Sequence, residues 1–286
     1  MPVKDLLIAL SVPLLWGFGL AISKLGMEQL PPMLINGLRW IIAGLVLVWW
    51  FPIPKKVMKE IFLVSFVAVT LQYGLTYTGV SMIDASSAVL LVQSEVPFGV
   101  LVAFFILKER PPIKNIIGLF IAFTGLVVLT GAPNLEGKYF GVFLVLSGAL
   151  TWAFGQVIAK PVSEKISSPI ALTAWIGILG GPQLIIASAF VEGDTLKHIT
   201  SANYVAWSIV LYLALLMTAV GYSFWYYILK RYPVNKVMPI HLLLPVSGII
   251  TAIVLLKEKP SIEVFIGGVI ILLGVGLILI SRENKK

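Results

Sequence analysis

Hydrophobic residues gather in ten long runs along this chain, and short polar or proline-rich breaks separate the runs. Each run is about 20 residues long, which is the length that a helix needs to cross the hydrocarbon core of a bilayer. The pattern therefore predicts ten membrane-spanning helices. Their expected ranges are 5–27, 33–51, 60–80, 85–107, 113–131, 138–160, 169–190, 204–228, 234–256 and 261–281.

The breaks between the runs hold residues that end helices, such as Pro31-Pro32, Pro111-Pro112 and Ser168-Pro169. Most of these connections are short, so we expect consecutive helices to be antiparallel neighbours. The longest break follows the seventh run, between Glu192 and Asn203. Its polar composition predicts a short helix at the membrane surface.

The second half of the chain repeats motifs of the first half. The segment 107–111, Leu-Lys-Glu-Arg-Pro, returns 149 positions later at 256–260 as Leu-Lys-Glu-Lys-Pro. An echo at a fixed spacing indicates a duplication. Single residues follow the same relation: Tyr73 and Tyr222, Tyr77 and Tyr226, and, at an offset of 136, Trp16 and Trp152.

Composition places the hydrophobic runs in lipid rather than in the core of a soluble protein. Hydrophobic residues make up 59% of the chain and charged residues 12%, whereas soluble domains carry about 25% charged residues. The net charge is +8, and the cations cluster between the runs. They therefore indicate membrane orientation and not a nucleic-acid partner. The absence of cysteine excludes disulfides and thiolate metal sites.

Lysine and arginine positions predict that both termini lie in the cytoplasm. With the N-terminus inside, fifteen of these residues fall in cytoplasmic segments and four in outer loops. Because each half holds five spans, the second repeat (135–286) must enter the membrane from the opposite side to the first (1–134). The predicted fold is an all-α membrane protein with ten transmembrane helices in two inverted five-helix repeats. Secondary transporters typically have this architecture.

A set of short motifs lies in register along the ten predicted spans. They are Trp16-Gly17, Pro31-Pro32 followed by Gly37-Leu38-Arg39-Trp40, Glu109, Trp152-Ala153, Val220-Gly221-Tyr222, and Pro245-Val246 with Glu258. Over essentially the whole chain these motifs resemble those of the EamA-type members of the drug/metabolite transporter superfamily. Within that superfamily the sequence is most similar to exporters of amino acids and their metabolites.

This resemblance implies a ten-helix bundle around a central cavity, without a cofactor, in the inner (cytoplasmic) membrane. It implies export of a small molecule from the cytoplasm by alternating access, driven by an ion gradient, with protons as a candidate, or by the substrate's own gradient. Alternatives within the superfamily are a carrier of nucleobases or cationic drugs, or an importer. A monomer and a homodimer both remain open.

Polar and aromatic side chains in the middle of the spans are candidates for lining the cavity. Tryptophan and tyrosine there can stack on a ligand or form hydrogen bonds with it, and the alternative role of each is helix packing. The candidate cavity residues are Trp16, Gln72, Tyr73, Tyr77, Gln93, Glu95, Trp152, Gln156, Tyr222, Tyr226 and His241.

Glu95 and His241 are the candidates for coupling transport to protons. Inserting an ionisable group at mid-membrane depth costs about 2.5–3.5 kcal/mol, so Glu95 is expected to face a cavity or a partner. The alternative is a structural ion pair with Arg39 or Lys24. His241 titrates near neutrality, and its alternative role is a hydrogen bond to a neighbouring helix. Pro97 predicts an irregular helix beside Glu95.

Three further charged residues are expected to have structural roles. Arg39 is predicted to pair with an acid, because its counterpart in the second repeat is Trp175. The alternative for Arg39 is to hold a substrate carboxylate. Glu109 and Glu258 lie at span ends, where helix capping and pairing at a gate are expected. Glycines in the spans, Gly99 among them, predict close helix contacts.

No enzyme motif is present in the sequence. There is no phosphate-binding Gly-x4-Gly-Lys-Ser/Thr motif, no cluster of metal ligands and no serine with a histidine partner at a recognisable spacing. The sequence therefore predicts a transporter and not an enzyme, without a metal.

Overall fold

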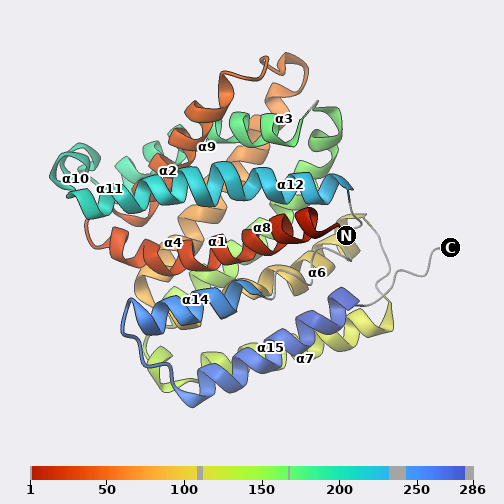
Figure 1. The fold of residues 1–286 in the computed structure, drawn as a ribbon. Coiled ribbons are helices and arrows are strands. Elements are labelled where there is room, and N and C mark those ends of the chain that lie inside the picture. The colour runs from red at the N-terminus through yellow and green to blue at the C-terminus, as the bar shows by residue number, and fades with distance from the viewer. Residues whose placement is uncertain (1, 108–111, 167, 232–242, 281–286) are drawn as a thin grey trace.

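The computed structural model describes residues 2–107, 112–166, 168–231 and 243–280, and every regular element in these ranges is a helix (Figure 1). The prediction of an all-helical protein is confirmed for these residues. Each of the ten hydrophobic runs contains helix, apart from the first part of the ninth run, which lies outside the described residues.

The described residues of the first half of the chain form seven α-helices and three short 3₁₀ or π-helical elements. In order they are α1 (Val3–Met27), α2 (Pro32–Val48), the 3₁₀ turn η1 (Lys55–Val57), α3 (Met58–Ser65), the π-helical segment η2 (Phe66–Leu71), α4 (Gln72–Met82), α5 (Ala85–Leu91), the 3₁₀ turn η3 (Val92–Ser94), α6 (Glu95–Leu107) and α7 (Ile113–Thr130).

The second half follows the same plan in the described residues. Its elements are the 3₁₀ turn η4 (Pro133–Leu135), α8 (Tyr139–Lys165), α9 (Pro169–Val191), α10 (Thr195–Ser201), α11 (Tyr204–Leu211), the π-helical segment η5 (Tyr212–Val220), α12 (Gly221–Arg231), α14 (Leu243–Val254) and α15 (Ile262–Ile280). The short helix predicted after the seventh run is α10.

Local sequence explains where several helices begin. Pro32 and Pro169 occupy the first turns of α2 and α9, where the missing N–H group of proline has no intrahelical partner to lose. The side-chain oxygen of Asn203 accepts hydrogen bonds from the backbone N–H groups of Val205 and Ala206 and so caps α11. The observed helix boundaries agree with the predicted ranges to within a few residues.

Among the described residues, five helical stretches are long and apolar enough to cross a membrane, namely Val3–Met27, Lys55–Met82, Tyr139–Ala159, Ile170–Val191 and Tyr204–Trp225. Four shorter apolar helices cover Pro32–Val48, Ile113–Leu129, Leu243–Val254 and Ile262–Leu277. Large apolar side chains also face outward from the bundle, among them Phe120, Phe143 and Leu273. Such a surface suits lipid and not water.

Two helices of the first half pack directly on the helices that correspond to them in the second half. α2 packs on α9, and α7 packs on α15, at opposite sides of the bundle (Figure 1). Between these two pairs, the hydroxyl oxygens of Tyr73 and of its counterpart Tyr222 are 2.7 Å apart. When a rotation axis relates two repeats, an element can contact its own counterpart only close to that axis. That axis therefore runs from the α2–α9 pair through Tyr73 and Tyr222 to the α7–α15 pair.

Glycines permit the close contacts along this axis. A Cβ atom on Gly44 of α2 would lie 2.6 Å from the backbone nitrogen of Ile178 in α9. A Cβ atom on Gly125 of α7 would lie 2.6 Å from the backbone nitrogen of Ile271 in α15. Real Cβ atoms do not approach backbone atoms so closely, so the helix backbones touch at these positions.

The prediction of a close helix contact is wrong for Gly99. A Cβ atom on Gly99 of α6 would meet nothing within 4 Å, whereas one on its counterpart Gly248 of α14 would lie 2.5 Å from Val89. Gly17 of α1 also packs against Gly248. The contact made by α14 in the second repeat is therefore tight, and the equivalent position on α6 in the first repeat is open.

Irregular helix occurs at corresponding places in the two halves. The π-helical segment η2 ends just before Tyr73, and η5 ends just before Tyr222. The hydroxyl of Thr218 in η5 donates to the carbonyl of Leu213, five residues earlier. The fourth run changes to 3₁₀ helix at η3, immediately before Glu95, as its proline predicts. π-helical segments frequently mark functional sites.

Candidate functional site

Arg39 is fully buried in the middle of α2. Its Nε donates to Thr218 Oγ1 at 2.5 Å, its Nη1 to the hydroxyl of Tyr77 at 3.1 Å and to Asn36 Oδ1 at 3.4 Å, and its Nη2 to the hydroxyl of Tyr73 at 3.3 Å. All four acceptors are neutral. In the described part of the chain no carboxylate forms an ion pair with Arg39.

Aromatic rings surround this guanidinium group. The carbon Cζ of Arg39 lies 4.9 Å from the ring centre of Tyr73 and 5.9 Å from that of Trp40, which are distances for cation–π attraction. The Tyr73 and Tyr77 rings stack with centres 5.4 Å apart, and Trp40 lies 5.2 Å from Tyr222. We call this set the Arg39 cluster: Asn36, Arg39, Trp40, Tyr73, Tyr77, Thr218 and Tyr222.

One buried donor in the cluster has no acceptor. The side chain of Trp40 is 3% exposed, and its Nε1 forms no hydrogen bond with any described residue. A buried polar group without a partner is uncommon in folded proteins and calls for an explanation. The sequence analysis did not select Trp40, because its place beside Arg39 in the chain does not show which way its indole points.

A glutamine joins α9 to the π-helical segment η2 in the other half of the bundle. Arg39 joins α2 to the π-helical segment η5 through Thr218. The amide of Gln183 in α9 accepts a hydrogen bond from Thr70 of η2 at 3.0 Å and donates to Ser65 of α3 at 2.9 Å. Gln183 does not occupy the position of Arg39, whose counterpart on α9 is Trp175.

Trp16 packs at the edge of the cluster. Its ring lies 4.7 Å from Tyr222 and 5.9 Å from Trp225, and its Nε1 donates to the carbonyl of Met217 at 2.9 Å. Its counterpart Trp152 is half-buried on α8 and makes no ring contact with another described aromatic residue. The structure therefore packs Trp16 into the bundle and leaves Trp152 partly exposed.

A second group of predicted residues lies on adjoining helices. Gln93 is buried in η3, and Glu95, at the start of α6, is half-buried. Trp152 and Gln156 stand one helical turn apart on α8, which packs on α6 and η3, and both are half-buried. No ion pair joins Glu95 to Arg39 or Lys24 among the described residues, so the alternative of a structural pair is not what the structure shows.

The structure describes some of the remaining predicted cavity residues and not others. The amide of Gln72 donates to Thr76 at 3.2 Å, on the face of α4 that packs against Gly148 of α8. The side chain of Tyr226 lies outside the described part of the structure, as do His241 and Glu109 in full.

Glu258 follows α14 and caps a different helix. Its two carboxylate oxygens accept hydrogen bonds from the backbone N–H groups of Ala85 at 2.7 Å and Ser86 at 3.0 Å, in the first turn of α5. Lys24 at the end of α1 pairs with Glu258 at 3.9 Å and donates to the carbonyl of Ile83. The ammonium group of Lys24 is therefore held within the protein by these contacts.

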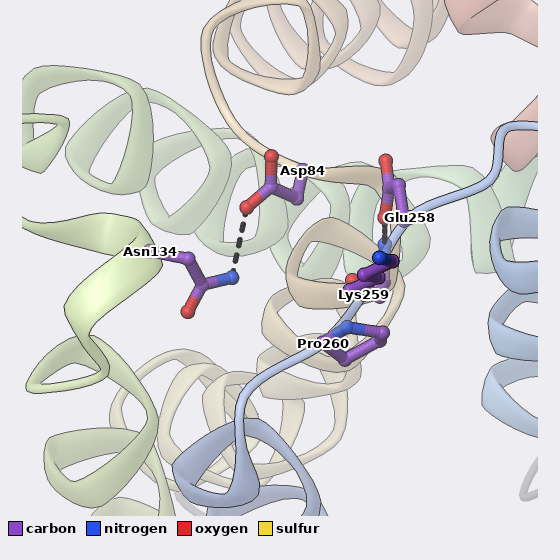
Figure 2. Close-up of a pocket in the computed structure, with 6 residues that line it drawn as sticks. Asp84, Asn134, Glu258, Lys259 and Pro260 are labelled. Atoms are coloured by element: carbon purple, nitrogen blue, oxygen red, sulfur yellow. Dashed lines mark hydrogen bonds between the residues drawn. The ribbon is translucent and has the colours of Figure 1, made fainter.

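Other polar side chains complete this end of the bundle. Asp84 accepts a hydrogen bond from Asn134 at 2.8 Å (Figure 2) and pairs with Lys138 at 3.5 Å. Ser86 is fully buried beneath this layer. The surface pocket formed here is lined by Asp84, Ser86, Asn134, Glu258, Lys259 and Pro260. At the start of α2, Glu192 likewise accepts hydrogen bonds from Met33 and Leu34.

With the geometry in place, the sequence can be compared with known families. The profile of the EamA-like transporter family matches twice, over residues 4–131 and 139–280. The chain belongs to the EamA-like transporter family. The chain is therefore a transporter with two family repeats, as the names of its relatives also indicate.

Named relatives match the EamA protein along nearly its whole length. It is 27% identical to a "Probable amino-acid metabolite efflux pump" of Escherichia coli (strain K12), over 100% of this chain and 98% of the relative. A protein of the same name from Salmonella typhimurium is 28% identical over 96% of this chain and 94% of the relative. A solved crystal structure shares the fold, with a TM-score of 0.67 and 17% identity, covering 97% of this chain and 96% of the other.

Proposed function

We propose that this protein is a secondary transporter that exports amino acids or related small metabolites across the cytoplasmic membrane by alternating access. The observation that carries the proposal is the end-to-end similarity to two bacterial proteins named probable amino-acid metabolite efflux pumps. The uncompensated charge of Arg39 in the middle of the bundle agrees with it, because a buried cation repels cationic drugs.

The contacts between equivalent elements support two inverted five-helix repeats in ten spans. The α2–α9 and α7–α15 pairs and the Tyr73–Tyr222 hydroxyl contact all lie where one half meets its counterpart. Repeats inverted in the membrane can exchange the two conformations of a carrier by rocking against each other. The positive-inside rule then places both termini in the cytoplasm.

We infer that, in this orientation, the structure represents a state that is closed to the outside. The Glu258 end of the bundle becomes the outer surface, where Glu258, Lys24 and Asp84 join α5, α1 and the loop after α7. Gly248 lies in the outer half of α14 and is tightly packed, whereas its counterpart Gly99 lies in the cytoplasmic half of α6 and meets open space. This difference between equivalent positions is expected of a carrier that is sealed outside and open inside.

Glu95 and His241 are the proposed proton-coupling groups, and His241 lies outside the described residues. Replacing Glu95 with glutamine is expected to keep substrate exchange and to remove its dependence on a pH gradient, because an amide cannot carry the proton. The measurement is uptake into proteoliposomes with and without an inward-acid gradient, for which the ratio of rates should fall to about one.

The matched control for this variant is Glu136→Gln, which changes an exposed acid in the loop before α8. Its response to the gradient should equal that of the wild type. A Glu95→Gln protein that still responds to the pH gradient as the wild type does would remove Glu95 from the mechanism.

The experiment that tests the proposed function is uptake of a panel of labelled amino acids into proteoliposomes that contain the purified protein. Saturable flux of one class of amino acid, blocked by excess unlabelled compound, is expected. If folded protein moves no amino acid, the substrate class is wrong, and nucleobases and cationic drugs become the next compounds to test. Flux only toward the cytoplasmic side would identify an importer.

A further inference from the structure

We propose that the Arg39 cluster is the site that binds the carboxylate group of the substrate. The protein would then select molecules with a free carboxylate, such as zwitterionic amino acids, over their amides and esters. This inference rests on the proposed export of amino acids and specifies which part of the substrate is recognised, and where.

The charge of Arg39 is the first argument. A guanidinium group in the membrane-embedded part of a protein is expensive and normally pairs with an acid. Arg39 is fully buried, and its described partners are three hydroxyl groups and one amide oxygen. A substrate carboxylate supplies the missing negative charge, so binding it stabilises a group that the empty protein leaves uncompensated.

The second argument is an excess of hydrogen-bond donors. A guanidinium group has five N–H donors, and the four hydrogen bonds of Arg39 leave one N–H of Nη2 without a described acceptor. The hydroxyl of Tyr77 accepts from Arg39, and its own hydrogen has no described acceptor. The indole Nε1 of Trp40 is buried and unpaired. An ionised carboxylate only accepts hydrogen bonds, through two oxygens, so it matches these donors.

Arg39 has no cationic counterpart in the second half of the bundle. Trp175 occupies the equivalent position on α9, and the neutral amide of Gln183 joins α9 to η2 at a different position on that helix. A positive charge at this position is therefore present in one half only, beside the tyrosines that mark the meeting of the two halves.

The position of the cluster fits a substrate site in a rocking carrier. It draws residues from α2 and α4 of the first half and from η5 and α12 of the second half. In the present state the hydroxyl groups of Tyr73 and Tyr77 occupy N–H groups of Arg39. A carboxylate accepts stronger hydrogen bonds from a guanidinium group than a neutral hydroxyl does. It therefore displaces the tyrosine hydroxyls as the two halves move apart.

The test compares an amino acid with its own amide. The probe is the amino acid that the wild-type protein transports best in the labelled panel, with its carboxamide as unlabelled competitor. The wild type is expected to bind the acid about 10- to 100-fold more tightly than the amide, because the amide loses the hydrogen bonds of a charged group. In Arg39→Gln, which removes the charge and keeps a side chain that can form hydrogen bonds, this ratio should fall to about one.

Two further variants separate recognition from structure. Gln183→Ala removes the hydrogen bonds of α9 to η2 and α3 and is expected to lower thermal stability while keeping the preference for the acid. Trp40→Phe removes the unpaired indole N–H and shortens the ring, and it keeps an aromatic ring beside Tyr73 and Tyr222. It is expected to reduce the preference severalfold with the protein folded, which gives a result even if Arg39→Gln does not fold.

Three outcomes would overturn the inference. A wild-type protein that takes the amide as well as the acid overturns this inference alone and leaves amino-acid export standing. A preference for the acid that survives in Arg39→Gln, or in Trp40→Phe where the first variant does not fold, overturns it as well. A wild-type protein that moves neither compound overturns the proposed function and this inference together.

Discussion

Replacing Gly44 with leucine is expected to prevent the two halves of the bundle from assembling. A Cβ atom at this position would lie 2.6 Å from the backbone nitrogen of Ile178 and 2.8 Å from the backbone carbon of Gly177. The clash is with helix backbone, so no side chain can rotate away, and α2 and α9 must separate. Overpacking of this kind costs about 3 kcal/mol or more. Size-exclusion chromatography in detergent should show little monodisperse protein.

The matched control is Gly99→Leu, because a Cβ atom on Gly99 meets nothing within 4 Å. This variant has the same change in mass and hydrophobicity and should elute as the wild type does. Normal folding of Gly44→Leu would show that α2 and α9 are not in backbone contact. It would also remove one of the three contacts that define the axis between the halves.

Replacing Glu258 with glutamine is expected to open the outer end of the protein. The glutamate accepts hydrogen bonds from Ala85 and Ser86 and pairs with Lys24, and glutamine has only one acceptor oxygen and no charge. Losing a hydrogen bond to a charged group costs about 1.5 kcal/mol, which raises the population of the open state about tenfold. Labelling of a cysteine placed at Ser86 by an impermeant maleimide should accelerate by that factor.

Glu192→Gln is the control for this prediction. Glu192 caps α2 through Met33 and Leu34 in the same way, but it lies at the α2–α9 pair, which we expect to stay together during transport. This variant should lose thermal stability without faster labelling at position 86. Equal labelling rates in the wild type and in Glu258→Gln would show that Glu258 does not hold the outer end closed.

The hydrophobic pattern was sufficient to predict the helices, because a helix that crosses lipid must be apolar and about 20 residues long. Motif spacing likewise predicted that Tyr73 and Tyr222 are counterparts. Their direct contact follows from the inverted arrangement. The sequence carried no signal for the π-helical segments, because the residues of η2 and η5 read as ordinary apolar helix.

The role of Arg39 could not be predicted from sequence for a different reason. A buried cation usually has an acidic partner, and the sequence offered Glu95 at similar depth. Only the rotation of α2 and α6 about their own axes decides whether the two side chains meet, and the structure places tyrosine hydroxyls around Arg39 instead. Gly99 was misjudged in the same way, because its counterpart Gly248 is tightly packed and the two halves differ at this point.

Alternating access is tested most directly by the accessibility of position 86 from outside. Ser86 is fully buried behind Glu258, and the chain has no cysteine of its own, so Ser86→Cys gives a single reporter. An impermeant maleimide should label it slowly in vesicles without substrate, and faster when the transported amino acid is present on the cytoplasmic side. A cysteine at the exposed Glu136 should react quickly in both cases. Labelling of position 86 at one rate with and without substrate would contradict alternating access through this end of the protein.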